Sequence, residues 1–563
     1  MKIAFLTSFN SDMFKKDFER YLEKSNLKCD LFWNGYSLHE QLVFDENSRL
    51  YEFQPTLIFI HFEIESLLGD LAYDILSLKD KEREIKIEEA KIKLSAIVKK
   101  LTEKLTDSLI VIENFIPRSN SYLGVMDLNI TCGLIEITNN LNYYLLSLRQ
   151  EFQNKIIINP YSELISKYGV DNCFDLRLYH LAKFPFAKKF YLNIFEHYTD
   201  IIKVIKSPRK KCIVCDLDNT LWGGIIGQDG IENIQLGGSG LGEAYVQFQK
   251  LLLNFYRRGI FLAVCSKNNY ADAIDVIDNH PDMILRKKYF ACIRINWDSK
   301  PLNIKSIADK LNIGTDSLVF IDDNPAECEL VKMQMPEVEV VNLAGDPDNY
   351  IEQLMKINSL QSVFITGEDL SRNLMYMVDI KRKLEETTYG NLNDYFKSLN
   401  MRAEISINTE SFFPRVSQLT QKTNQFNLTT KRYSNEEINK FVTSGNYNVY
   451  TLRLIDKYGD NGIVVVAIIE KENDQWYIDS FLMSCRVIGR QAETALLNTI
   501  IEDALKENVK MLRGNFIKSE KNSPAQEFYR MHNFIEKSNN YWELELPDQL
   551  KEHFIKIIRE NHI

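Results

Sequence analysis

The residues CIVCDLDNTLWGG, from Cys212 to Gly224, indicate the architecture at the centre of this chain. Its apolar beginning predicts a buried strand, and the polar residues after it predict a turn. Asp216 and Asp218 therefore lie at the C-terminal end of a strand, where open α/β sheets bind ligands. Two carboxylates so close repel each other unless a cation lies between them or one is protonated, and Mg²⁺ prefers such hard oxygen ligands. One carboxylate can attack phosphorus while the other transfers a proton.

Three further features follow in the order that this chemistry requires. An apolar run ends at Ser266, whose hydroxyl suits a phosphate oxygen, and Lys300 can neutralise charge on a nucleophile and a phosphate. A second apolar run leads into Asp322 and Asp323, a second acidic strand end for the metal. The first two acids alone could be turn residues, but the ordered series favours a phosphoryl-transfer site.

The same series resembles the haloacid dehalogenase (HAD) superfamily of aspartate-nucleophile phosphotransferases. The resemblance implies a Rossmann-like parallel sheet, with Asp216 as nucleophile and Asp218 as general acid and base. It also implies two phosphate-binding groups, Ser266 and Lys300. Four carboxylates would surround Mg²⁺, those of Asp216, Asp218, Asp322 and Asp323. Four polar or aromatic side chains are candidate substrate contacts: Thr220, Trp222, Asn268 and Asn324.

Motifs along nearly the whole chain resemble the FkbH-like branch of that superfamily. They are DLDNTLWGGIIGQDG, SKNN, INWDSKPLNI and FIDDNPAE in the centre, LTQKTNQFNL and SCRVIG downstream, and Gly35-Tyr36 followed by LYEF upstream. The resemblance implies a bacterial enzyme that loads a glyceryl or related hydroxyacyl unit onto the phosphopantetheine thiol of an acyl carrier protein, with loss of phosphate. The implied donor is a phosphorylated three-carbon acid such as 1,3-bisphosphoglycerate, and the implied pathway is polyketide or surface-polysaccharide biosynthesis.

One position departs from that branch. In several members thought to load carrier proteins, a Cys between the two acids is the suspected acyl-carrying nucleophile, and here Leu217 stands at that position. Cys215 precedes Asp216, and strand alternation should point its side chain away from that carboxylate. We therefore expect no acyl thioester on the enzyme here, and expect the acyl unit to pass directly to the carrier thiol.

The interval between Asp218 and Ser266 holds a Gly-rich stretch and one expected helix, at about 242–258, which leaves no room for a large cap domain. An uncapped site suits a macromolecule or a prosthetic arm, whereas small-molecule members more often carry a cap that excludes water. The loop 222–230 is expected to form a flap over the metal. Trp222 would either face the substrate or anchor this flap in the core.

The N-terminal part alternates strand-like and helix-like segments, which predicts a flavodoxin- or SGNH-like α/β domain with a parallel sheet. Buried strands are expected at 3–6, 56–62, 108–112 and 155–158, and a long charged helix at 74–106. Ser8 and Asn114 each follow a strand, a placement that resembles SGNH-type hydrolases. A catalytic Ser needs a His base, and His180 and His197 both lack a recognisable Asp-x-x-His motif. A scaffold or carrier-docking role is therefore preferred to an esterase.

The last part of the chain predicts a GNAT-like α+β domain. Strands are expected at 461–467 and 475–481, followed by a loop at 485–492 and a helix. The loop resembles the pyrophosphate loop of GNAT-type N-acyltransferases, where backbone N–H groups at a helix N-terminus hold a pantetheine-bearing cofactor. Three residues are expected to bind phosphopantetheine or coenzyme A: Arg486, Gly489 and Arg490. A purely structural loop remains the alternative.

Composition limits the class of protein. At 563 residues the chain should form several domains, and a net charge of −10 argues against a nucleic-acid partner. Nine scattered Cys predict reduced thiols in a cytoplasmic protein, and no apolar run is long enough to cross a membrane. The expected parts are an SGNH-like domain at 1–200, a HAD-like domain at 205–366, a helical linker at 367–398 and a GNAT-like domain at 399–563. A plain phosphatase and a GNAT-type N-acyltransferase remain alternative functions.

Overall fold

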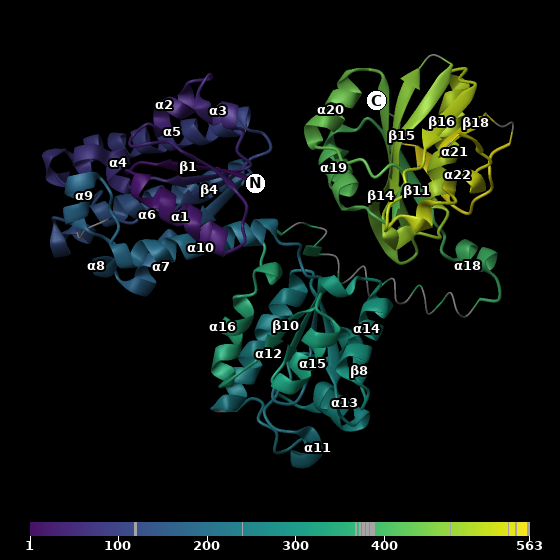
Figure 1. Ribbon diagram of the computed structural model, residues 1–563, viewed down its shortest axis with the longest axis horizontal. Coiled ribbons are helices and arrows are strands. Elements are labelled where there is room, and N and C mark those ends of the chain that lie inside the picture. Colours follow the sequence, from purple (N-terminus) through teal and green to yellow (C-terminus); the bar gives the residue numbers. More distant parts are fainter. Residues whose placement is uncertain are drawn as a thin grey trace. The chain divides into compact units, whose positions relative to one another are not determined.

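The computed structural model describes residues 1–117, 121–238 and 240–365, scattered positions between 367 and 385, and residues 389–472, 474–538, 540–546 and 549–559. The chain forms two compact units, Met1–Asp369 and Leu370–Ile563, which have separate hydrophobic cores (Figure 1). Much of the predicted helical linker at 367–398 before residue 389 lies outside the described residues, and its last part forms α18, Leu392–Ser398. The exact boundaries of the domains stay predictions.

The first sheet of the first unit contains parallel strands in the order β2-β1-β3-β4-β5. Its strands are β1 Lys2–Thr7, β2 Asp30–Trp33, β3 Leu57–His61, β4 Leu109–Glu113 and β5 Ile156–Asn159. The four predicted strands are confirmed as β1, β3, β4 and β5, whereas the edge strand β2 is not among those predicted. The strand order reverses between β1 and β3, and such a switch point opens a crevice at the C-terminal ends of the strands.

Helices cover both faces of this first sheet. Residues of α1 and α10 share one core with β1 and β3, and residues of α5 and α6 share the other. The helices are α1 Asp12–Lys24, α2 His39–Phe44, α3 Arg49–Phe53, α4 Ile64–Leu68, α5 Asp80–Lys104, α6 Leu134–Glu151, α7 Tyr161–Tyr168, α8 Val170–Cys173, α9 Leu176–Ala182 and α10 Lys188–Lys206. The predicted charged helix is shorter at its start, because the Glu82 carboxylate accepts the Lys79 N–H and caps the helix there.

The second sheet of the first unit also contains parallel strands, in the order β10-β9-β6-β7-β8. They are β6 Cys212–Cys215, β7 Phe261–Ser266, β8 Phe290–Ile295, β9 Leu318–Asp322 and β10 Glu339–Asn342. The short apolar runs read from the sequence become β6, β7 and β9. Because β6 is central, buried on both faces, its residues are all apolar or Cys.

Helices flank the second sheet as well: α11 Ile226–Asp229, α12 Leu241–Arg257, α13 Tyr270–Asn279, α14 Lys300–Leu311, α15 Pro325–Gln334 and α16 Tyr350–Met355. The predicted helix at about 242–258 is confirmed as α12. Among the described residues between β6 and β7, the regular elements are α11 and α12. The chain therefore places no large described insertion over the C-terminal edge of β6.

The second unit contains a mixed sheet in the order β17-β18-β16-β15-β14-β13-β11-β19. Its strands are β11 Arg402–Ile407, β13 Tyr447–Asp456, β14 Gly459–Glu472, β15 Gln475–Met483, β16 Met511–Asn515, β17 Ile535–Ser538, β18 Tyr541–Glu545 and β19 Lys556–Arg559. The helices are α18, α19 Phe413–Lys422, α20 Asn435–Thr443, α21 Ala492–Lys506 and α22 Phe528–Met531. The mixture of antiparallel and parallel pairs agrees with the α+β class expected for this part.

A short strand, β12 Phe426–Asn427, fills a gap in this mixed sheet. The parallel pairing of β15 with β16 ends at Ile478, and β12 pairs with β15 beyond that point. The Leu428 N–H donates to the Phe481 carbonyl at 3.0 Å, and the Ile517 N–H donates to the Leu428 carbonyl at 2.8 Å. The segment therefore joins β15 to the chain after β16 where those two strands separate.

Candidate active site

The C-terminal edge of the second sheet carries the predicted acids. Cys215 pairs in register with Val264 of β7 and Ile321 of β9, so Asp216 emerges between the ends of both neighbours. The Asp216 N–H donates to the Ile321 carbonyl at 3.0 Å, which fixes the backbone at this point. The parallel pairing therefore brings Asp216, Ser266 and Asp322 to one edge, as the sequence predicts.

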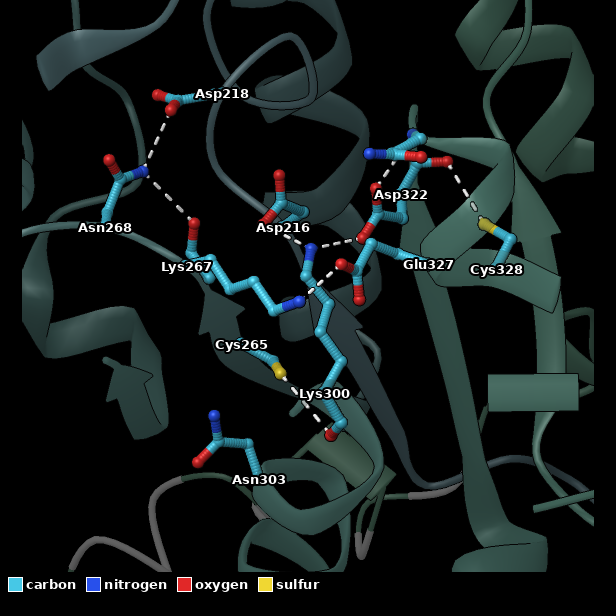
Figure 2. A network of polar contacts seen from close by, with 12 residues as sticks. Asp216, Asp218, Cys265, Lys267, Asn268, Lys300, Asn303, Asp322, Glu327 and Cys328 are labelled. Carbon is cyan, nitrogen blue, oxygen red and sulfur yellow. Dashed lines mark hydrogen bonds and ion pairs between the residues drawn. The ribbon is translucent and has the colours of Figure 1, made fainter. Parts of the chain in front are cut away.

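Lys300, the first residue of α14, joins the acids of two strands. Its Nζ donates to Asp216 Oδ1 at 2.7 Å and also contacts Asp322 Oδ2 (Figure 2). All three side chains are buried. Burial alone would lower the pKa of Lys300, but the two carboxylates outweigh it and raise that pKa. Lys300 is therefore a fixed cation beside the proposed nucleophile.

The carboxylates suit a divalent cation. Ligand oxygens of Asp216, Asp322 and Asp323 all lie within 4.8 Å of one another. Burial and the nearby Asp216 raise the pKa of Asp322 to about 7, and the same causes raise the pKa of Asp323. The three carboxylates repel one another when they are ionised, and a divalent cation between them would remove that repulsion. Carboxylate oxygens are also the ligands that Mg²⁺ prefers. The fourth predicted ligand, Asp218, lies outside this group of three.

Asp218 accepts three hydrogen bonds from side chains and backbone. Its Oδ1 accepts from Trp222 Nε1 at 3.0 Å and from the Ile226 N–H at 3.2 Å, and its Oδ2 accepts from Asn268 Nδ2 at 3.0 Å. Burial raises the pKa of Asp218, and these hydrogen bonds oppose the rise. The carboxyl is therefore held in one orientation, as a proton-transferring group requires.

Trp222 anchors the flap and does not face the solvent. Its side chain is fully buried in the core of the second sheet, while its indole N–H reaches Asp218. Of the two alternatives for this residue, the structure supports the core anchor. Gly224 and Gly230 bound the rest of the flap with φ values of +95° and +74°, which residues with a side chain rarely adopt.

The three other candidate substrate contacts, Asn268, Asn324 and Thr220, have different environments. Asn268 Nδ2 also lies 3.2 Å from Ser266 Oγ, so these two polar groups form one surface with Asp218. Asn324 caps α15, with its Oδ1 accepting the Ala326 N–H at 2.9 Å, which is a structural role. Thr220 is buried, and its Oγ1 has no hydrogen-bond partner among the described residues.

Sequence reasoning missed one ion pair at this edge. Lys267 Nζ lies 2.5 Å from Glu327 Oε1, and the two residues belong to the quoted motifs SKNN and FIDDNPAE. Neither residue is among the predicted site residues, because only the order of the strands brings them together. Their positions in the sequence could have indicated them, because Lys267 follows Ser266 by one residue and Glu327 follows Asp322 by five residues.

Ser8 and Asn114 of the first sheet make hydrogen bonds to separate neighbours. Ser8 Oγ accepts the Glu63 N–H at 2.9 Å and makes no hydrogen bond to a histidine in the described part of the chain. Asn114 Nδ2 donates to Ser162 Oγ at 2.7 Å. His197 Nε2 lies 2.8 Å from Asn159 Oδ1 instead. The scaffold or docking role of this domain stays a prediction.

Four polar residues end the strands of the first sheet on one side: Thr7, His61, Glu113 and Asn159. All are buried. Asn159 Nδ2 donates to Glu113 Oε2 at 2.6 Å, and His61 Nδ1 lies 2.8 Å from the Tyr198 hydroxyl. Burial raises the pKa of Glu113 to about 8 and lowers the pKa of His61 to about 3. Both groups are therefore neutral near pH 7.

The predicted phosphopantetheine loop lies between β15 and α21, and two of its side chains already contact other residues of the protein. Gly489 is exposed and has φ +83°, and no atom lies within 4 Å of a Cβ added there. Arg486 Nε lies 3.3 Å from Ser484 Oγ. Arg490 is different, because its Nη1 lies 3.5 Å from Asp456 Oδ2 and its side chain is only 12% exposed. The loop therefore exposes Gly489 at the surface, Arg486 is half-buried, and Arg490 is tied to the interior.

Comparisons with known proteins give one family and one structure for the first unit. Residues 2–203 match the family model described as FkbH, N-terminal domain. Among solved structures, the N-terminal part of protein BF1531 from Bacteroides fragilis, described as containing a phosphatase domain complexed with Mg, is 29% identical. That alignment covers 65% of this chain and 94% of the other, with a TM-score of 0.56. The chain is therefore similar to FkbH N-terminal domains at 2–203 and, over a larger part, to a protein described as containing a phosphatase domain.

Other comparisons concern smaller parts of the chain. The ribosomal-protein-S18-alanine N-acetyltransferase of Escherichia coli is 15% identical over 27% of this chain and 99% of that one, with a TM-score of 0.21. A GNAT-family acetyltransferase of Staphylococcus aureus Mu50 is 15% identical over 26% and 99%, with a TM-score of 0.22. Comparison with curated proteins gives no match. No helix in the described part of the chain is long and apolar enough to cross a membrane.

Proposed function

We propose that this chain, which matches the FkbH N-terminal domain model over residues 2–203, is a Mg²⁺-dependent glyceryl or hydroxyacyl transferase and phosphatase that serves an acyl carrier protein. One observation carries the phosphoryl chemistry. Asp216 lies at a strand end beside a buried Lys300 and within reach of two further acids, Asp322 and Asp323. A carboxylate so placed has a fixed cation to offset charge as it reacts.

Asp216 would attack the phosphorus atom of the substrate. A bond forms between a carboxylate oxygen and phosphorus while the bond from phosphorus to the leaving oxygen breaks. Asp218 gives its proton to that leaving oxygen and takes a proton from the water that then hydrolyses the phosphoryl group on Asp216. The raised pKa of Asp218 suits the first of these transfers. Ser266 and Lys300 hold phosphate oxygens, and Mg²⁺, when bound by the carboxylates, supplies further positive charge.

The proposed donor, 1,3-bisphosphoglycerate, contains two kinds of phosphate. Its acyl phosphate can be attacked at the carbonyl carbon by the carrier thiol, which forms a thioester and releases phosphate. Its phosphate ester is a substrate for the Asp216 chemistry. Leu217 offers no thiol between the two acids, so the acyl unit would pass directly to the carrier.

The experiment combines the purified chain, Mg²⁺, 1,3-bisphosphoglycerate and a holo acyl carrier protein. Intact-protein mass spectrometry of the carrier and a colorimetric phosphate assay then report the two reactions separately. We expect a glyceryl mass increment on the carrier, with phosphate released in parallel. Phosphate release without any carrier adduct would support the plain phosphatase. In a separate incubation of the chain with acetyl coenzyme A and an amine, acyl transfer to the amine would support the GNAT-type alternative.

A further inference from the structure

The ion pair of Lys267 and Glu327 has no role in the chemistry described so far. Lys267 Nζ lies 2.5 Å from Glu327 Oε1, and the side chains are 35% and 17% exposed. Lys267 directly follows β7, between Ser266 and Asn268. Glu327 lies in the first turn of α15, directly after the acids of β9. Both residues therefore stand on the edge of the sheet that carries the proposed active site.

The order of the strands places this pair next to the strand that carries the nucleophile. In the sheet, β6 lies between β9 and β7. A contact between a residue that follows β7 and a residue that follows β9 must therefore cross the end of β6, from which Asp216 emerges. Figure 2 shows the Lys267 side chain extending toward Glu327 on the side of the site where Lys300 reaches Asp216. The pair therefore lies beside Lys300 and Asp216 at the ends of the strands.

The hydrogen-bonding capacity of the pair points to one chemical group. The Lys267 ammonium has three N–H donors, and its contact with Glu327 Oε1 uses one. Glu327 Oε2 is buried and has no hydrogen-bond partner among the described residues. A hydroxyl group both accepts and donates, so it can take an N–H from Lys267 and give its proton to Glu327. The pair is neutral as a whole, so it has no excess charge for a second anion.

We infer that the Lys267–Glu327 pair binds a hydroxyl group on the carbon chain of the substrate, close to the phosphate. The favoured substrates are phosphate esters of polyols or hydroxy acids. Glu327 Oε2 is buried, but the Lys267 side chain beside Glu327 is 35% exposed, so a shift of Lys267 would admit the hydroxyl without unpacking the core. This inference rests on the proposed phosphoryl chemistry at Asp216, which supplies the fixed point for the phosphate.

The first test compares phosphate release from glycerol 1-phosphate and from propyl phosphate, which lacks the hydroxyl groups. For the wild-type chain we expect kcat/KM to favour glycerol 1-phosphate by about 10- to 100-fold, the range for one hydrogen bond to a charged group. In Glu327→Gln and Lys267→Gln this ratio should fall toward one. A matched control is Glu329→Gln on the same helix, because Glu329 pairs with Lys332 at the exposed surface and should leave the ratio unchanged.

The second test measures binding without catalysis and without metal. Isothermal titration calorimetry compares 3,4-dihydroxybutylphosphonate with butylphosphonate on the wild-type chain and the same three variants. We expect tighter binding of the dihydroxy compound by the wild type and by Glu329→Gln, and a lost preference in the two pair variants.

The outcomes separate this inference from the function on which it rests. Absence of phosphate release from either ester, with the phosphonate preference intact, would overturn the proposed function and keep the hydroxyl site. Equal wild-type binding of both phosphonates, or a preference that survives Glu327→Gln, would overturn the hydroxyl site. A uniform loss of activity toward both esters in the pair variants, with an unchanged ratio, would give the pair a purely structural role.

Discussion

The Asp216 carboxylate accepts a hydrogen bond from the Lys300 ammonium, with 2.7 Å between Oδ1 and Nζ, and both side chains are buried. The same ammonium contacts Asp322 from the next strand of the sheet. One cation thus fixes the orientation of two acids that would otherwise repel each other. This shared contact is the reason that the loss of either acid should affect the whole site.

Replacement of Asp216 by Asn should abolish phosphate release, because an amide is too poor a nucleophile to attack phosphorus. The measurement is phosphate released from a small phosphate ester in the presence of Mg²⁺. Asp309→Asn, which changes an exposed acid of α14, is the control and should retain wild-type activity. Wild-type release by Asp216→Asn would show that the nucleophile is a different residue.

Replacement of Asp218 by Asn should slow turnover by about 10²–10⁴-fold, through lost proton transfer. The Asn side chain would also turn an N–H group toward Trp222, Ile226 or Asn268, each of which now donates to the carboxylate. Leaving-group dependence checks the cause: the loss should be smaller for p-nitrophenyl phosphate, whose leaving group needs no proton. An equal loss of turnover for p-nitrophenyl phosphate and for an alkyl phosphate ester would assign Asp218 a positioning role only.

No stable acyl adduct should form on a Cys of the HAD site. Cys215 is fully buried, and burial raises the pKa of its thiol, so it is neither accessible nor ionised. The test is intact-protein mass spectrometry after incubation with 1,3-bisphosphoglycerate in the absence of a carrier. A glyceryl mass increment that disappears in Cys215→Ser would contradict the prediction.

Replacement of Gly489 by Asp should separate the two proposed activities, phosphate release and transfer to a carrier protein. The new carboxylate would repel a bound phosphate of the phosphopantetheine arm, so transfer to a holo carrier protein should fail, while phosphate release from a small ester should survive. Gly489→Ala is the matched control, because it shares the strain of a side chain at φ +83° without the charge. Circular dichroism confirms the fold of both variants. Carrier acylation at the wild-type rate in Gly489→Asp would make this loop structural.

The first sheet should show a pH-dependent stability that Glu113 causes. The pKa of Glu113 is about 8 in the folded chain and near 4.5 when the side chain is exposed. At any pH between these two pKa values, unfolding therefore releases the proton of Glu113. Its contribution to the free energy of unfolding is therefore present below about pH 4.5 and is lost progressively as the pH rises to about 8. Glu113→Gln should reduce the fall in the thermal midpoint between pH 5 and pH 8, measured by calorimetry. Glu151→Gln, at the exposed end of α6, is the control and should keep the wild-type slope.

The sequence predicted the elements with continuous apolar runs and missed those without them. The strands β1, β3 and β4 are buried along most of their length, whereas β2 reads DLFW, lies at the edge and is partly exposed. Edge strands need no apolar face on both sides, so their pattern is weak. The start of α5 differs for a local reason, since the Lys79–Glu82 cap overrides the helical pattern upstream.

The site residues also divide into those that the sequence predicted and those that it did not. Asp216 and Asp322 could be predicted because each follows its own apolar strand in a fixed order. The Lys267–Glu327 pair could not, because it depends on β6 lying between β7 and β9, which the chain order does not reveal. The contact of Arg490 with Asp456 could not be predicted either, because Asp456 belongs to β13 and no local pattern connects the two residues; the role of Arg490 in binding stays a prediction.

The β12 segment bears on how the second unit could admit a pantetheine arm between its strands. The amide protons of Leu428 and Ile517 are committed to hydrogen bonds that exist only while this segment stays between β15 and the chain after β16. Deuterium uptake at these two amides therefore measures how often the segment leaves. A ligand that inserts between β15 and β16 would have to displace the β12 segment and would therefore speed deuterium exchange at the Leu428 and Ile517 amides. A ligand that stays on the loop at Gly489 would leave both exchange rates unchanged.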